Sequence, residues 1–246
     1  MRRQAMCALM VFACLALVGR AMASVVVSDS FAGGLGGWMH GSDAEGVAGF
    51  RSGATAATTP AHADHSSAVL NAEGDGPGGV VWLDSAFPID PGIYKVTVSF
   101  WVYSSNDADG TTSNAIAVIK GGSIGGGSDF SFVRRIEPSL GWQHLRMTKT
   151  VSVERGQKLH VGMGFQRTSP AAVKYAFDDV AVDLERVDCR ADVDGSGSLS
   201  VQDVFSFMDA WFDGAPAGDF DGSGRIDMHD VFAFLNAWLA GCGAGA

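Results

Sequence analysis

The sequence contains one short unit twice: Asp192-Val-Asp-Gly-Ser-Gly-Ser-Leu-Ser-Val-Gln-Asp203 and, 27 residues later, Asp219-Phe-Asp-Gly-Ser-Gly-Arg-Ile-Asp-Met-His-Asp230. Each copy runs into a similar apolar segment, Val204-Phe-Ser-Phe-Met-Asp-Ala-Trp211 in the first and Val231-Phe-Ala-Phe-Leu-Asn-Ala-Trp238 in the second. The apolar positions of these segments recur with a helical period. The end of the chain is therefore predicted to be a tandem of two loop–helix halves.

The oxygen-bearing residues of each copy are spaced as in a twelve-residue loop that wraps a hard cation. Such a loop supplies oxygens at positions 1, 3 and 5, a backbone carbonyl at 7, often a water-bridged group at 9, and a carboxylate at 12. Gly197 and Gly224 stand at position 6, where the loop turns sharply. We predict two calcium sites, with the ligands Asp192, Asp194, Ser196, the carbonyl of Ser198, Ser200 through water and Asp203, and then Asp219, Asp221, Ser223, the carbonyl of Arg225, Asp227 and Asp230.

The two loops depart from the common EF-hand pattern, because position 5 is Ser and position 12 is Asp instead of Glu. A full EF-hand also has a helix before each loop, and the segments 187–191 and 215–218 are too short or interrupted to supply one. A tandem of loop–helix halves with Asp at position 12 resembles the dockerin module of secreted bacterial proteins. Gly241-Cys242 at the end, with Cys189 ahead of the first loop, is similar to the dockerin subgroup whose ends carry cysteines.

The dockerin resemblance covers residues 188–246 and implies calcium-dependent docking to a cohesin-like protein or a cell-surface component. Loop positions 10 and 11 help to contact the partner in dockerins, which assigns partner binding to Val201, Gln202, Met228 and His229. The resemblance also implies a bond between Cys189 and Cys242. The sequence has four cysteines, and Cys7 and Cys14 lie in an N-terminal secretory signal predicted at 1–23, so two remain after its removal. An exported chain with such a pair permits a disulfide, which would contribute ~4 kcal/mol for a loop of this length.

Each predicted helix carries more apolar surface than is needed to bury one side. In the first, the apolar residues span a stripe roughly 160° wide, whereas ~100° suffices to face a core. The excess, which recurs in the second helix, fills a small core or meets a partner. The residues of the two stripes are Val204, Phe205, Phe207, Met208, Trp211 and Phe212, and Val231, Phe232, Phe234, Leu235, Trp238 and Leu239.

Residues 1–23 have the pattern of a secretory signal. Arg2 and Arg3 give a positive start, the apolar run 5–18 is too short to span a bilayer, and Ala21-Met-Ala23 is a small-residue cleavage site. No later apolar stretch approaches 18 residues, so no transmembrane segment is expected after signal removal. The formal charge of -10, without a basic run, argues against nucleic acid as a partner. We predict a secreted protein, extracellular or at the cell surface.

Residues 24–187 are a different kind of sequence, with turn signals between short alternating runs. In Tyr94-Lys-Val-Thr-Val-Ser-Phe-Trp-Val102 every second residue is apolar and falls on one face. Similar runs occur at Leu145-Arg-Met147, Val151-Ser-Val153, 159–165 and 175–182. This pattern is typical of half-buried antiparallel strands. The predicted fold class is mainly β: an antiparallel β-sandwich or jelly roll, followed by the small α-helical dockerin-like domain.

The order of these runs, from Asp29-Ser-Phe31 and Gly37-Trp38 to the run at 175–182, resembles the jelly-roll carbohydrate-binding modules of polysaccharide-degrading enzymes. In such modules a structural calcium commonly ties an acidic residue near the first strand to one in the last. The counterparts here are Asp29 and Asp179, so the resemblance implies a third calcium. The alternative for Asp178-Asp179 is a strand bulge with solvated carboxylates.

Two aromatic residues, one inside the run at 94–102 and one just after it, alternate with the apolar residues and therefore fall on the opposite face of the strand. Trp101 and Tyr103 fall on the polar side, and aromatic planes on such faces stack on the apolar side of a pyranose. His144 and Arg146 share a strand face and would add polar contacts. We predict a ligand site formed by these four residues. The alternative is that the two aromatics pack beneath the Gly-rich loop 121–128.

The sequence contains no persuasive catalytic motif. It has neither a Gly-x-Ser-x-Gly elbow nor a His-Glu-x-x-His helix, and His62-Ala-Asp-His65 is either a metal site or an exposed loop. The predicted function is therefore that of a secreted, non-catalytic protein, which binds a polysaccharide or glycan and is docked by its C-terminal module. The alternatives are a dockerin-anchored polysaccharide hydrolase or lyase acting on the β-sandwich, and a purely structural surface protein.

Overall fold

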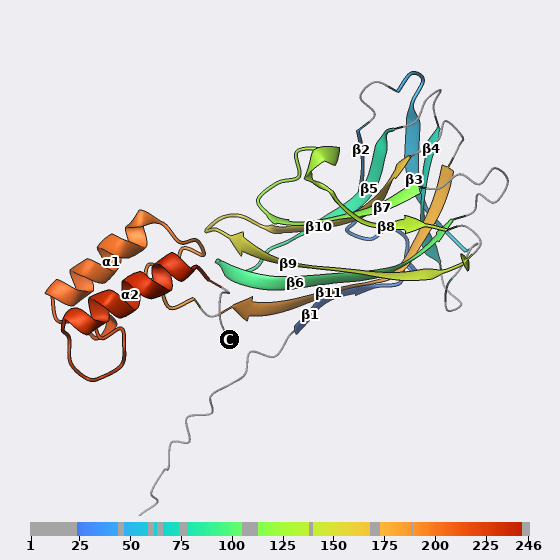
Figure 1. Cartoon of the computed structure of the whole chain (residues 1–246). Helices are drawn as coiled ribbons and strands as arrows, with labels where there is room; N and C mark the ends of the chain where they lie inside the picture. Colours follow the sequence, from blue (N-terminus) through green and yellow to red (C-terminus); the bar gives the residue numbers. More distant parts are fainter. Residues whose placement is uncertain are drawn as a thin grey trace, which may run out of the picture.

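The computed structural model describes residues 24–43, 47–58, 62, 66–73, 78–104, 113–137, 140–167, 173–187 and 189–242. The predicted secretory signal at 1–23 lies outside the described residues. Two antiparallel sheets pack face to face, and two helices follow them at one end (Figure 1). The predicted fold class, a β-sandwich followed by a small helical module, is confirmed.

The first sheet has the strand order β3-β4-β11-β6-β9, and β1 pairs with the C-terminal half of β11, from Val180 to Leu184. Its strands are β1 (Ser24–Asp29), β3 (Arg51–Ala57), β4 (Ser67–Glu73), β6 (Gly92–Ser104), β9 (Gln143–Val153) and β11 (Val173–Val187). The second sheet has the order β2-β5-β10-β7-β8. Its strands are β2 (Met39–Asp43), β5 (Val80–Phe87), β7 (Ser113–Gly121), β8 (Ser131–Ile136) and β10 (Leu159–Arg167), with a short turn η1 (Gly127–Asp129) between β7 and β8.

The core lies between the sheets and is built from alternate residues of their strands. Every second residue of β6 from Tyr94 to Val102 is buried, as the alternation predicts. β10 buries Val161, Met163 and Phe165 in the same way. The runs at 145–147 and 151–153 belong to one strand, β9. Burial of these aliphatic and aromatic side chains is the main stabilising contribution to the sandwich.

β11 contains a bulge at the two adjacent aspartates. The pairing of β11 with β6 shifts between Asp178 and Ala181, and Asp179 has a left-handed φ of 45°. The bulge that was the alternative interpretation of this pair is therefore present, but the solvated carboxylates expected with it are wrong for Asp178. That residue is fully buried, and its Oδ1 accepts a hydrogen bond of 2.8 Å from the Asp179 amide.

The helical module comprises α1 (Val201–Phe212), η3 (Pro216–Gly218) and α2 (Met228–Ala240). Ser200 and Asp227 cap the two helices, and each forms a capping box with the aspartate three residues later. Cys189 and Cys242 form a disulfide with their Cα atoms 5.2 Å apart, which confirms the predicted pairing. Neither helix in the described part of the chain is long and apolar enough to cross a membrane.

The two halves of the module are related by approximate two-fold symmetry. Phe207 and Phe234, 27 positions apart, are fully buried and stacked, with ring centroids 4.3 Å apart and an interplanar angle of 11°. The Trp211 indole donates to the Asp227 carbonyl at 2.9 Å, and the equivalent Trp238 donates to the Ser200 carbonyl at 3.2 Å. Each helix therefore secures the loop of the other half.

This core predicts a sharp difference between two phenylalanines of α1. Phe207→Ala removes a buried ring and should lower the free energy of unfolding of the module by about 3–5 kcal/mol. Phe205, which is 60% exposed on the same helix, is the matched control, and its replacement by Ala should change that free energy by less than about 0.5 kcal/mol. Denaturant titration followed by the helical circular dichroism signal measures both values, and equal losses would contradict the assigned core.

Candidate functional sites

Five rings gather on the outer face of the first sheet and are here called the aromatic face: His62, Trp101, Tyr103, Trp142 and His144. Trp101 lies opposite His144 in the β6–β9 ladder, and their ring centroids are 5.0 Å apart. His62 stacks on Trp101 with a centroid distance of 4.4 Å and an interplanar angle of 26°. Trp142 bridges the cluster, with centroids 5.2 Å from His62 and 5.5 Å from Tyr103.

The structure brings together three of the four predicted ligand residues, Trp101, Tyr103 and His144. Arg146 lies opposite Ser99 on the same sheet face and is exposed. The alternative that the aromatics pack beneath the loop 121–128 is wrong, because that loop belongs to the other sheet. Within it, the Gly127 amide donates to the Asp43 carboxylate at 3.3 Å.

Sequence reasoning missed three residues of this face: Trp142, His62 and Asp179 as a polar neighbour of the rings. Trp142 stands two residues before His144, so the same parity argument could have found it. His62 Nδ1 lies 2.8 Å from Asp179 Oδ2, a contact between residues 117 positions apart that no local pattern reveals. The structure thus places His62 against Asp179 and Trp101, whereas Asp64 and His65 of the suggested metal motif lie outside the described residues.

Asp29 and Asp179, the predicted ligands of a third calcium, have different neighbours. Asp29 accepts hydrogen bonds from the Phe31 amide at 2.8 Å and from the Trp38 indole at 3.1 Å. Asp29 pairs with Val180, directly beside the bulge, but the Asp179 carboxylate contacts His62. A third calcium between the two carboxylates stays a prediction.

The outer face of the second sheet also carries a tryptophan, but this one is covered. Trp82 is only 7% exposed, its indole donates to Asp84 at 3.0 Å, and the Phe130 ring lies 5.1 Å away. Burial raises the pKa of Asp84 and lowers the pKa of the nearby His160. A ring held in this way has little free surface for stacking on a ligand, in contrast to Trp101, Tyr103 and Trp142, which are half-buried.

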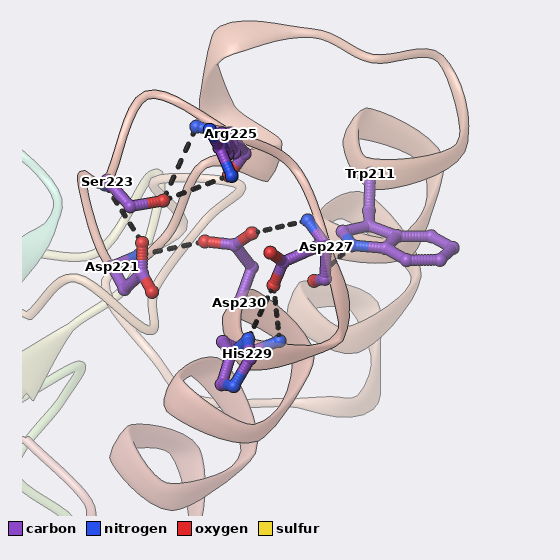
Figure 2. Close-up of polar contacts among 7 residues, drawn as sticks. All are labelled: Trp211, Asp221, Ser223, Arg225, Asp227, His229 and Asp230. Carbon is purple, nitrogen blue, oxygen red and sulfur yellow. Dashed lines mark hydrogen bonds and ion pairs between the residues drawn. The ribbon is translucent and has the colours of Figure 1, made fainter.

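In both loops of the module, three predicted ligand carboxylates converge. Oxygens of Asp192, Asp194 and Asp203 lie within 4.8 Å of one another, and so do oxygens of Asp219, Asp221 and Asp230. The position-12 residues Asp203 and Asp230 are fully buried and held by amides of their own loops. Figure 2 shows the second loop, where the Asp230 carboxylate accepts from the amides of Asp221 at 3.0 Å and Asp227 at 2.8 Å.

The donor set fits a hard divalent cation. All the converging groups are oxygens, which suits calcium, and each loop brings like charges together that a cation would neutralise. In the second loop Asp219 Oδ1 is buried without a hydrogen-bond partner, although Oδ2 accepts from the Gly224 amide at 2.9 Å. In the first loop both oxygens of Asp192 accept backbone amide protons. The two aspartate clusters can therefore hold metal ions. In the second cluster, Asp219 Oδ1 has no hydrogen-bond partner and is available to a cation.

The four predicted partner-binding residues Val201, Gln202, Met228 and His229 are all exposed. They lie at the starts of α1 and α2 in equivalent positions of the two halves. Beside them, Phe205 and Phe232 are an equivalent exposed pair. Hydrogen bonding to Asp227 raises the pKa of His229, which has no charged counterpart at Gln202. The two halves thus present exposed residues in equivalent positions, with a titratable histidine in one half and a glutamine in the other.

No protein-family model matches the sequence, and no curated protein matches it. Solved structures do match at low identity. A carbohydrate-binding module of the β-sandwich superfamily, described as promiscuous in specificity, has 13% identity and a TM-score of 0.41, with 62% of this chain and 59% of that chain covered. The chain thus spans less than two thirds of that protein's length.

Two further solved structures match over almost their full length. The CBM22-1 xylan-binding domain of Xyn10C from Paenibacillus barcinonensis has 15% identity and a TM-score of 0.44, with coverage of 68% of this chain and 97% of that one. The carbohydrate-binding module TmCBM27, described for mannan recognition, has 12% identity and a TM-score of 0.42, with coverage of 68% and 99%. At these identities the comparison assigns no ligand to this chain.

Proposed function

We propose that this protein is secreted, binds a polysaccharide through its aromatic face, and is docked by its calcium-binding module to a cohesin-like protein or a cell-surface component. The observation that carries the binding function is the gathering of five rings on one outer sheet face. The docking function rests on the two oxygen-lined loops and on the exposed residues beside them.

The aromatic face has the two properties that a sugar platform needs. Its tryptophan and tyrosine rings can stack on the apolar side of a pyranose, while His144, Arg146 and Asp179 can reach its hydroxyls. The Trp101 ring is also held in place, because the rings of His62 and His144 both contact it. A ring ordered before binding loses little conformational entropy when the ligand arrives.

The competing function is a polysaccharide hydrolase or lyase on the same sandwich. Glycoside hydrolysis normally requires two carboxyl groups that flank the scissile bond. Among the described residues, two adjacent carboxylates lie beside the rings: Asp179, which is engaged with His62 at 2.8 Å, and Asp178, which lies opposite Trp101 in the β6–β11 ladder and is fully buried. We favour binding over turnover because Asp178 is buried and Asp179 is bonded to His62, so neither is a free carboxyl group on the ring surface.

The first prediction concerns calcium. The full chain should bind two calcium ions in the module, and Asp203→Ala or Asp230→Ala should each abolish one of them, because each removes the buried position-12 carboxylate. Isothermal titration calorimetry gives the stoichiometry. Two unchanged sites in both variants, or circular dichroism that chelation leaves unaltered with the disulfide reduced, would show that these loops are not the cation sites.

The second prediction concerns the aromatic face. A panel of polysaccharides is first screened by affinity electrophoresis for one that retards the unaltered protein. Trp101→Ala should abolish that retardation. It should also lower the melting temperature by only a few degrees, because about 1 kcal/mol corresponds to about 2–4 °C in a domain of this size. Phe132→Ala is the matched control: this ring is 63% exposed on the opposite sheet, so its loss should leave retention unchanged.

The same experiment separates the competing functions. Loss of retention in Phe132→Ala with full retention in Trp101→Ala would move the site to the second sheet. Release of oligosaccharides from a retained polysaccharide would identify a hydrolase or lyase. No retention on any polysaccharide would favour a purely structural surface protein.

The third prediction concerns docking. Replacing Met228 and His229 by Ala should change partner affinity by a different factor from replacing Val201 and Gln202, because position 11 is a histidine in one half and a glutamine in the other. A difference of about 1.4 kcal/mol corresponds to tenfold in affinity. A partner is first isolated by pull-down in the presence of calcium, and calorimetry with that partner then measures both effects. Equal effects would indicate that the module binds in either of two orientations.

A further inference from the structure

The first cation loop packs against the β-sandwich at Gly197, whereas the equivalent glycine of the second loop, Gly224, does not. Gly197 and Gly224 occupy the same position of their loops and have similar left-handed φ values of 86° and 80°. A Cβ atom on Gly197 would lie 2.4 Å from the Gly92 amide nitrogen and 2.5 Å from the Val153 carbonyl oxygen. A Cβ atom on Gly224 would meet nothing within 4 Å. The first loop therefore touches the sandwich backbone, where only a glycine fits.

The contact lies at the end of the β6–β9 ladder, where Gly92 pairs with Val153. The neighbouring residue of β9, Ser152, donates a hydrogen bond from its hydroxyl to the Gly197 carbonyl. Ser152 is itself fixed, because its carbonyl packs so closely on β7 that a Cβ atom on Gly121 would approach it to 2.3 Å. The loop thus rests on a rigid part of the sandwich that involves both sheets.

Gly197 is also part of the cation site. Its amide donates to Asp192 Oδ2 at 3.0 Å, and Asp192 is the first predicted ligand of that loop. One residue therefore joins a ligand carboxylate on its amide side to β9 on its carbonyl side. The link along the chain between the sandwich and the helical module is also short, because a single residue separates the end of β11 at Val187 from Cys189. Figure 1 shows the module beside the ends of β6, β9 and β11.

We infer that a divalent cation in the first loop fixes the helical module against the β-sandwich, and that Ser152 and Gly92 act as an outer support of that cation site. This inference rests on the proposed calcium binding. A cation that orders the loop around Gly197 favours the contact with Ser152, and the contact favours the cation by the same factor, as thermodynamic linkage requires. The docking face is then held at a fixed orientation to the aromatic face.

The linkage is tested by calcium titration of the full chain carrying Ser152→Ala. Loss of one hydrogen bond to the loop should weaken one of the two calcium sites by about threefold to tenfold and leave the other unchanged. Thr150→Ala is the matched control, since Thr150 is exposed on the same face of β9 two residues earlier and should have no effect. Equal binding curves for Ser152→Ala, Thr150→Ala and the unaltered chain would overturn the inference.

The orientation is tested with a matched pair of loop variants. Gly197→Ala and Gly224→Ala impose the same left-handed strain on equivalent positions, but only the first collides with the sandwich. In small-angle X-ray scattering with calcium present, Gly197→Ala should have a larger radius of gyration than the unaltered chain, and Gly224→Ala should not. Removing calcium with a chelator should also increase the radius of gyration of the unaltered chain. If the chain binds two calcium ions and the two variants scatter alike, the linkage is wrong while calcium binding stands; a chain that binds no calcium refutes both.

Discussion

The two-sided alternation of β6 is the constraint on which the rest of the sandwich depends. Successive side chains of a strand point to opposite faces, so the same thirteen residues supply the core row from Tyr94 to Val102 and the outward rings of Trp101 and Tyr103. A slip of one residue would expose Phe100 and bury Trp101. Because β6 lies between β11 and β9, both ladders hold its register, and the core and the aromatic face are fixed together.

The bulge in β11 adapts that constraint to the site. Tyr175 and Phe177 face the core before the bulge, and Val180 and Val182 face it afterwards, so the extra residue resets the alternation. Asp179 takes a left-handed conformation that costs about 1–2 kcal/mol for a residue with a Cβ atom. The hydrogen bond to Asp178 offsets part of this cost. The result is a carboxylate in contact with His62, whose ring stacks on Trp101.

The parts that sequence alone predicted are those governed by local spacing. Long alternating runs predicted β6, β9, β10 and the two halves of β11, and the twelve-residue spacing predicted the two loops in which three carboxylates converge. The weak strands β2 and β3, with sequences Met-His-Gly-Ser-Asp and Arg-Ser-Gly-Ala-Thr-Ala-Ala, carry no such signal, because only their pairing partners make them strands. The contacts of His62 with Asp179 and of Gly197 with Ser152 join distant segments, so they emerge only from the folded chain.

The module shows how a duplicated sequence becomes asymmetric through its surroundings. Its core keeps the symmetry, in the stacked Phe207 and Phe234 and the reciprocal tryptophan bonds. Two effects then separate the loops. The second gains one carboxylate, Asp227, but that group is exposed and bonded to His229, which reduces its pull on a cation. The first gains a hydrogen bond from a rigid strand, worth about 1 kcal/mol. Because the two effects act in opposite directions, the calcium affinities of the two loops should lie closer together than their carboxylate counts suggest.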